Sequence, residues 1–421
     1  MRIPGGTDGR RMLAVTFVDK AGSGLWGATS ALYFTFVAGL GAAEIGLLIG
    51  LSGAIGIAGP PLGGLLADRV PLRPLLAVVQ AVRAAASFAL LATTDLRLLL
   101  LIAAVGSLGD RSSSVLTKLY ATRVAGEERS RYQAVNRIVS NIGWAVGGLV
   151  AASALTAGTT AVYRWLLVGD ALSFVLAALL VLRYAEPPSL SRVMTKSAEG
   201  MESIEAMKGA EGAKGANPWR DRRYLAYTAS EAVLFLDDSV LTVGLPLWTV
   251  TATTAPHQVV PLLLVLNNVL VVCFQVPFAR FGTTAHVARG ALLPLGAVFF
   301  AGGAALTASA VDTPWIAVGA LVLAATAFTV AEILHATISW ELSVALAPPA
   351  AQGAYLGVHG LAQAVQRSAG PLIVTCAIAV GPTGWLALGA GLAAMCCGQR
   401  HLVRDRDRTA LSVPTVTLSE H

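Results

Sequence analysis

The feature that most constrains this chain is a repeated apolar run, long enough to cross a lipid bilayer. One run extends from Glu44 to Leu66 and the next from Leu75 to about Thr93. As helices, both could span a hydrocarbon core of about 30 Å. Of the 421 residues, 55% are hydrophobic and only 13% are charged, a composition typical of membrane proteins. The sequence therefore predicts a helical integral membrane protein.

Twelve apolar segments can be laid out as transmembrane helices, which predicts an all-α fold. The last two are divided at the turn of Gly381, Pro382 and Gly384. Because the first segment is long and lacks a small-residue cleavage site, we expect a retained helix and not a signal peptide. The expected ranges are 12–38, 43–67, 74–93, 97–121, 132–156, 161–182, 223–250, 258–280, 285–309, 314–343, 353–380 and 381–400.

Basic residues lie almost entirely on one side of this layout. If both termini are cytoplasmic, the outside loops hold only Arg97 and Arg164. The inside segments hold Arg2, Arg10, Arg11, Arg69, Arg73, Arg123, Arg129, Arg131, the 183–223 cluster, Arg280, Arg289 and Arg400 to Arg408. This asymmetry predicts a multi-pass protein of the cell membrane with both ends inside. Because the basic residues sit in loops between apolar runs, the net charge of +6 does not indicate nucleic-acid binding.

A polar stretch rich in Lys, Arg, Glu and Gly divides the helices into two sets of six. We expect an N-terminal half at 1–182, a cytoplasmic linker at 183–222, a C-terminal half at 223–400 and a cytoplasmic tail at 401–421. The linker is expected to contain a short surface helix around Ala198 to Lys208.

An internal repeat supports this division. Tyr132, Val135 and Gly147 match Tyr355, Val358 and Gly370 at one constant offset of 223 residues, and Asp110 and Glu332 fall within one residue of it. Chance similarity between two Gly-rich helices is the alternative. Together with the six-linker-six layout, the repeat favours two pseudo-symmetric halves related by an axis along the membrane normal.

The short loop after the second helix reads GGLLADRVPLRP from Gly63 to Pro74. Its G-x-L-x-D-R pattern, with Gly64, Asp68, Arg69 and a shifted basic Arg73, resembles the signature loop between helices 2 and 3 of the major facilitator superfamily. That resemblance implies a transporter that rocks two six-helix halves around a midplane cavity. It also implies that Asp68 latches the halves together at the N-terminus of helix 11, where free amides and the helix dipole favour an anion.

Ionisable residues inside spanning helices are costly, so they are candidates for function. Asp19 shares a helix face with Ser23 and Trp26, which suits a substrate cavity, although an ion pair without a transport role is the alternative. Asp110 and Arg111 are adjacent and point about 100° apart. We therefore expect at least one of them to have a partner on another helix.

The fifth helix resembles the antiporter signature of drug exporters. Its Gly143, Gly147 and Gly148 fit that pattern, but the kinking proline is missing. Close packing between helices is the structural alternative for these glycines. Arg137 lies in the unusually polar first half of this helix.

Acidic residues also mark the seventh and tenth helices, where Glu231, Asp237, Asp238 and Glu332 are expected in apolar surroundings. Such a carboxyl can take up and release a proton as a cavity opens to either side, which a proton-coupled carrier requires. Glu332 with His335 is expected to form a second site of this kind. The alternative for Asp237 and Asp238 is exposure to outer water or pairing with arginines such as Arg83 or Arg367.

These patterns lead us to expect a proton-coupled exporter of small amphipathic molecules or drugs, acting by antiport as a monomer. Apolar cavity walls with a few acids would suit cationic or amphipathic substrates. The alternative is a proton symporter or uniporter for a small, anionic solute bound by Arg111, Arg137 or Arg367. A receptor that transports nothing is a further alternative.

The sequence argues against enzymatic or cofactor chemistry. The six histidines are scattered without metal-ligand spacing, and there is no Gly-rich phosphate loop. We therefore expect no enzyme, no metal and no cofactor. All four cysteines fall in apolar runs and are expected to be small buried residues outside any disulfide.

Overall fold

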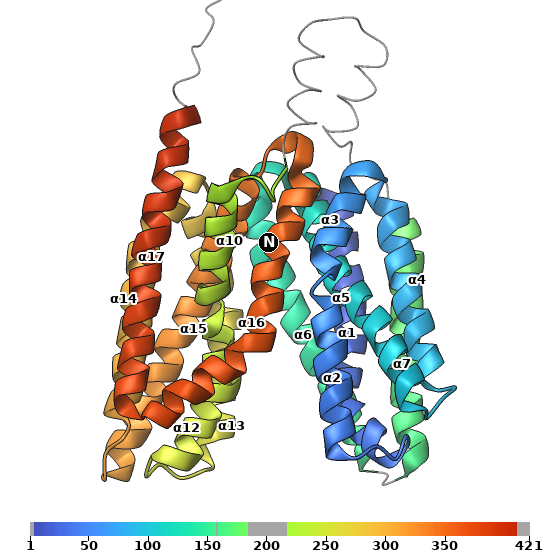
Figure 1. Ribbon diagram of the computed structural model, residues 1–421, viewed down its shortest axis with the longest axis horizontal. Helices are drawn as coiled ribbons and strands as arrows, with labels where there is room; N and C mark the ends of the chain where they lie inside the picture. Colours follow the sequence, from blue (N-terminus) through green and yellow to red (C-terminus); the bar gives the residue numbers. More distant parts are fainter. Residues whose placement is uncertain (1–3, 157–158, 184–216, 411–421) are drawn as a thin grey trace, which may run out of the picture.

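The computed structural model describes residues 4–156, 159–183 and 217–410, all of them in helices, turns or short connections. The expected linker helix around Ala198 to Lys208 and the last part of the tail lie outside these residues. Figure 1 shows two helical bundles side by side, one built from α1 to α7 and the other from α10 to α17.

The N-terminal half contains six membrane-crossing segments, the second of which is broken. Its helices are α1 (Gly6–Phe36), α2 (Ala42–Gly56), α3 (Gly59–Arg69), α4 (Leu72–Leu90), α5 (Leu96–Ala125), α6 (Arg129–Leu155) and α7 (Thr160–Leu182). The break between α2 and α3 follows Gly56 and precedes Pro60 and Pro61. Because proline lacks an amide hydrogen and clashes with the preceding turn, it starts a new helix there.

The C-terminal half has the same organisation, and its first segment is the interrupted one. That segment runs through α10 (Arg222–Leu234), α11 (Leu236–Ser239), a π-helical turn (Val240–Gly244) and α12 (Leu245–Ala252). The other helices are α13 (Val259–Phe278), α14 (Ala285–Ala308), α15 (Pro314–Ala345), α16 (Gln352–Val380) and α17 (Pro382–Ala410). A π turn inside a helix often marks a functional position.

Within the described residues, nine helical segments are long and apolar enough to cross a membrane. The more polar α1, α16 and α17 complete twelve crossings. The expected twelve-helix, all-α membrane fold is confirmed, and most helix ends fall within a few residues of the expected ones. Gly143 and Gly147 of α6 lie against the α1 backbone at Phe17 and Ala21, which is the close packing given above as the structural alternative for these glycines. The cysteines differ: Cys396 is buried, but Cys273, Cys376 and Cys397 are exposed.

The two halves meet at one face of the molecule, which we call the latch face. Here Asp68 at the end of α3 accepts hydrogen bonds from the backbone amides of Gly353 (2.9 Å) and Ala354 (2.7 Å), at the N-terminus of α16. The expected contact of Asp68 with this helix is therefore present. The signature residue Gly64 allows it, because a Cβ at Gly64 would lie only 2.9 Å from the Cα of Gly357.

Further contacts between the halves reinforce the latch face. Arg129 of α6 makes a two-pronged ion pair with Glu341 of α15, at 2.8 and 2.7 Å. The Ser130 hydroxyl donates to the carbonyl of Gly282. Of the basic residues of the signature loop, Arg69 is exposed, and Arg73 donates to the carbonyl of Leu182 in its own half.

Candidate transport site

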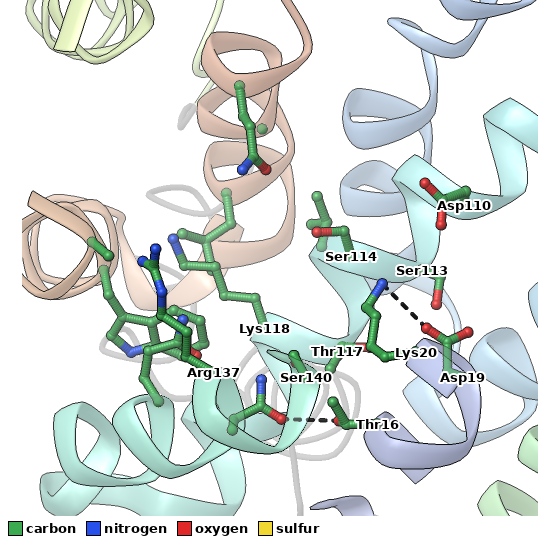
Figure 2. Close-up of a pocket in the computed structure, with 18 of the residues that line it drawn as sticks. Thr16, Asp19, Lys20, Asp110, Ser113, Ser114, Thr117, Lys118, Arg137 and Ser140 are labelled. Carbon is green, nitrogen blue, oxygen red and sulfur yellow. Dashed lines mark hydrogen bonds and ion pairs between the residues drawn. The ribbon is translucent and has the colours of Figure 1, made fainter. Parts of the chain in front are cut away.

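A cavity of about 260 Å³ lies between the halves, at the inner end of the latch-face contacts. Side chains of both halves line it, from α1, α4, α5 and α6 on one side and from α15, α16 and Phe235, between α10 and α11, on the other. Most of them are polar or charged, in contrast to the apolar walls expected from the sequence. Figure 2 shows Asp19, Lys20 and Asp110 at one side of this cavity and Lys118 and Arg137 toward the other.

An acidic cluster around one arginine forms the wall in the N-terminal half. Arg83 of α4 is buried, and its Nη1 contacts Asp19 Oδ1, whereas its Nη2 donates to Asp110 Oδ1 at 2.9 Å. Gln80 donates to the same Asp19 oxygen at 3.0 Å, and Lys20 Nζ lies 3.3 Å from the other one. The expected partner of Asp110 on another helix is therefore Arg83. The Asp110 side chain stays 43% exposed, so this acid is accessible from the cavity.

Lys118 of α5 stands out because it lacks a carboxylate partner. Its ammonium donates to Ser343 Oγ at 2.7 Å and lies 4.9 Å from the centre of the Trp340 ring. Within the described part of the chain, no acidic oxygen lies within 4 Å of it. Lys118 is thus a cation at the cavity wall whose charge is not directly compensated.

Arg137 and Glu332 link the halves across the cavity. Arg137 of α6 pairs with Glu332 Oε1 of α15, and Asn267 of α13 donates to Glu332 Oε2 at 2.9 Å. Glu332 and His335, which were expected to form one site, have different partners. Although they are one turn apart on α15, Glu332 points to α6 and α13, whereas His335 points to α11.

A buried network of acids and histidines lies behind the cavity in the C-terminal half. Glu231 accepts hydrogen bonds from Ser339 and Gln399, and one of its oxygens lies 3.4 Å from His335 and 3.5 Å from His359. His335 is also 3.1 Å from Asp237. Because Ser339 and His359 line the cavity, they connect it to the fully buried Glu231.

Three other predicted residues lie apart from the cavity lining. Asp238 is exposed while its neighbour Asp237 is buried, so the two carboxyls do not share one environment. Arg367 on α16 is exposed as well. Arg111 donates to the carbonyl of Ala364 at 3.2 Å and so joins the two halves. All three lie outside the cavity lining.

Gln80, Lys118 and His359 line the cavity but were not among the expected site residues. Arg83 pairs with Asp19 and Asp110, whereas its expected partners were Asp237 and Asp238. Arg83 and Lys118 carried a usable signal, because each is a cation well inside an apolar run. Gln80 and His359 carried no such signal, since a single polar residue on a helix can equally be a packed core residue or a residue that lines a cavity. In the part of the chain that the structure describes, no group of His, Cys, Asp and Glu side chains is arranged to hold a metal ion.

Comparison with solved structures identifies the architecture. The fold matches a bacterial homologue of the iron transporter ferroportin in an outward-facing state, with a TM-score of 0.69, 14% identity, and coverage of 97% of this chain and 100% of that one. It also matches the proton:xylose symporter XylE (TM-score 0.66, 16% identity, 94% and 95% covered). The human organic anion transporter MFSD10 matches with a TM-score of 0.62 and 18% identity, with 94% and 99% covered. Such low identities establish the fold alone.

At the level of sequence, no curated protein matches the chain significantly. A family profile does, however, and it covers most of the chain, from residue 12 to residue 371. Together with twelve crossings in two halves and a polar cavity between them, this match shows that the chain is a multi-pass membrane transporter that belongs to the Major Facilitator Superfamily.

Proposed function

We propose that the protein is a monomeric, proton-coupled secondary transporter that moves a small organic solute by alternating access in the cell membrane. The observation that carries this proposal is the location of the polar cavity, which lies between the halves and beneath the contacts of the latch face. The hydrogen bonds that Asp68, Lys118, Arg129, Ser130, Arg137 and Arg111 make to the other half lie between the latch face and mid-depth. If the basic latch face is cytoplasmic, as its charge favours, this is the state open to the outside.

Proton coupling is proposed to act through the ion pairs that join the helices. Glu332 and Arg137 belong to different halves, so a proton on Glu332 would remove one electrostatic tie between them. Asp19 and Asp110 depend in the same way on Arg83. A proton on either acid would free part of the guanidinium and alter the cavity wall. The buried Glu231 could exchange protons with the cavity through Ser339 and His359.

The uncompensated cation favours an acidic solute. Lys118 lies at the cavity wall without a carboxylate partner, and Trp340 beside it could pack against an apolar part of the solute. A carboxylate or phosphate bound there would supply the missing negative charge. We therefore rank a small organic anion first, carried together with protons by symport.

Export of small amphipathic molecules by proton antiport is the second candidate. The accessible carboxylate of Asp110 favours it, because an organic cation could compete with Arg83 for this acid. In that mechanism a proton and the cation would occupy the acidic wall alternately.

Two substitutions separate these candidates. The protein would be reconstituted in liposomes loaded with a pH-sensitive dye, and the proton flux would be recorded with organic anions, neutral drugs and lipophilic cations. Anion transport is expected to move protons with the solute and to be lost in Lys118→Met but retained in Asp110→Asn. Drug antiport predicts the opposite pattern, with protons leaving as a cation enters.

The exposed loop variant Asp312→Asn serves as the control, because it removes a carboxylate far from the cavity. Correctly folded wild-type protein that moves none of these solutes, with or without a proton gradient, would refute the proposed function.

A further inference from the structure

A second cavity, of about 350 Å³, lies inside the N-terminal half. It is enclosed by α1, α2, α4, α5 and α7, whereas the central cavity lies between the halves. Among the described residues, Asp110 alone lines both cavities. Gly27 and Ile49 are exposed at its rim, so the cavity can be entered. Its volume falls in the range of small-molecule sites.

One part of this cavity is aromatic and apolar. Trp26 and Phe34 of α1 meet edge to face with ring centroids 5.5 Å apart, and the buried Leu48 and Leu90 lie with them. Rings held in this way offer both flat apolar surface and the negative faces of their π systems. This part of the cavity suits a ring or a short hydrocarbon chain.

The other part contains a carboxyl without adequate partners. Asp170 of α7 is 1% exposed, and its Oδ2 accepts a hydrogen bond of 2.9 Å from Ser87. Its Oδ1 has no hydrogen-bond partner among the residues that the structure describes. In the described parts of the chain, no basic nitrogen lies within 4 Å of it. Leaving a buried carboxylate without a counter-charge is costly, so this group calls for a proton or a cation.

The nearby arginine is already committed elsewhere. Arg83 contacts Asp19, Gln80 and Asp110, and its guanidinium carbon lies 3.9 Å from the centre of the Phe174 ring. Three acids thus surround one guanidinium, with Asp19 on α1, Asp110 on α5 and Asp170 on α7. Lys20 pairs with Asp19, so two cations, Arg83 and Lys20, face these three acids. One acid is left in excess, and Asp170 is the acid that has no basic nitrogen within 4 Å among the described residues.

We propose that this cavity is a binding site for a small organic monocation with an aromatic or hydrocarbon body. Its ammonium group would lie at Asp170 and supply the missing charge, and its body would pack against Trp26 and Phe34. A positive centre near aromatic faces gains further attraction. The site is distinct from the proposed transport cavity, and its existence does not depend on which solute is carried there. Because Asp110 is shared, a cation bound in this site would act on the central cavity through Arg83.

Equilibrium binding to the full-length protein in lipid nanodiscs tests this proposal by isothermal titration calorimetry. The probes are 2-phenylethylammonium and its neutral counterpart 2-phenylethanol. We expect the ammonium to bind on the order of tenfold more tightly than the alcohol, because only the ammonium forms a charged hydrogen bond. Asp170→Asn, which keeps the shape and a hydrogen bond to Ser87, should weaken ammonium binding by about tenfold and leave the alcohol unchanged.

A second variant and a control ensure that the test does not depend on correct folding of Asp170→Asn alone. Ser52→Leu fills the cavity from α2 without changing any charge, and it should weaken both probes. Lys118→Met alters only the central cavity and should change neither. Wild-type affinity for the ammonium in both Asp170→Asn and Ser52→Leu would overturn the proposal. The proposal would also be overturned if Asp110→Asn lost ammonium binding while Asp170→Asn kept it, because the cation would then occupy the central cavity.

Discussion

The ion pair between Arg129 and Glu341 offers a quantitative test of the latch. Glu341 is 2% exposed and Arg129 is 27% exposed, and two hydrogen bonds of 2.8 and 2.7 Å join them. Breaking a buried pair costs about 3–5 kcal/mol. Because water reaches Arg129, we expect Glu341→Gln to destabilise the closed latch by a smaller amount, about 2–3 kcal/mol. That corresponds to roughly a 30- to 140-fold shift of the equilibrium. If about 1% of the wild type has an open latch face, the variant would then approach equal populations.

Double electron–electron resonance, which measures the distance between two spin labels, can detect this shift of the equilibrium. Spin labels would be placed at Val70 and Thr283, which are exposed and belong to different halves, in a background without the native cysteines. The variant should gain a longer distance between the labels. The matched control is Glu128→Gln, because Glu128 forms an exposed pair of 3.6 Å with Arg131 at the same face, and such pairs contribute little. Identical distance distributions for Glu341→Gln and the wild type would refute the reasoning.

Other substitutions test the packing, the coupling network and the acidic wall. Gly64→Val should force the latch face open, because its side chain would collide with the Gly353 and Gly357 backbone; the same label pair would then report the longer distance, and an unchanged distance would contradict the close approach. Glu231→Gln should abolish proton flux while exchange of labelled solute across the liposome membrane persists, and retained proton flux would exclude Glu231 from coupling. Arg83→Lys should lower the unfolding temperature by several degrees, because a lysine cannot serve Asp19 and Asp110 at once. Thermal unfolding followed by fluorescence would measure it, and a wild-type value would mean that the acids do not need the guanidinium.

Much of the architecture could be predicted because membrane insertion leaves a strong local signal. A spanning helix needs about twenty apolar residues wherever it occurs, so helix number and approximate ends follow from the chain itself. The contact of Asp68 with α16 was also predictable, because Asp68 lies in a recognisable loop and a helix N-terminus attracts an anion. Gly143 and Gly147 similarly required a close neighbour, and α1 provides it.

The choice of partners could not be predicted in the same way. Asp237 and Asp238 are adjacent in sequence, yet the irregular turn around them buries one beside His335 and exposes the other. Glu332 and His335 share a helix, but they face different neighbours. Such choices depend on how helices rotate and pack against one another, which hydrophobic pattern alone does not determine. Asp170 was overlooked for a related reason, since its importance appears only when Arg83 is found to be occupied.

The most direct test of alternating access around the central cavity is the accessibility of Gln363, an exposed residue of α16 that lines it. A single cysteine would replace Gln363 in the cysteine-free background, and a membrane-impermeant maleimide would be applied to either face of sealed, oriented vesicles. We predict labelling from the face opposite the latch in the otherwise wild-type protein, and from both faces once Glu341→Gln is added. Labelling of the otherwise wild-type protein from the latch face, or from neither face in both backgrounds, would contradict the proposed mechanism.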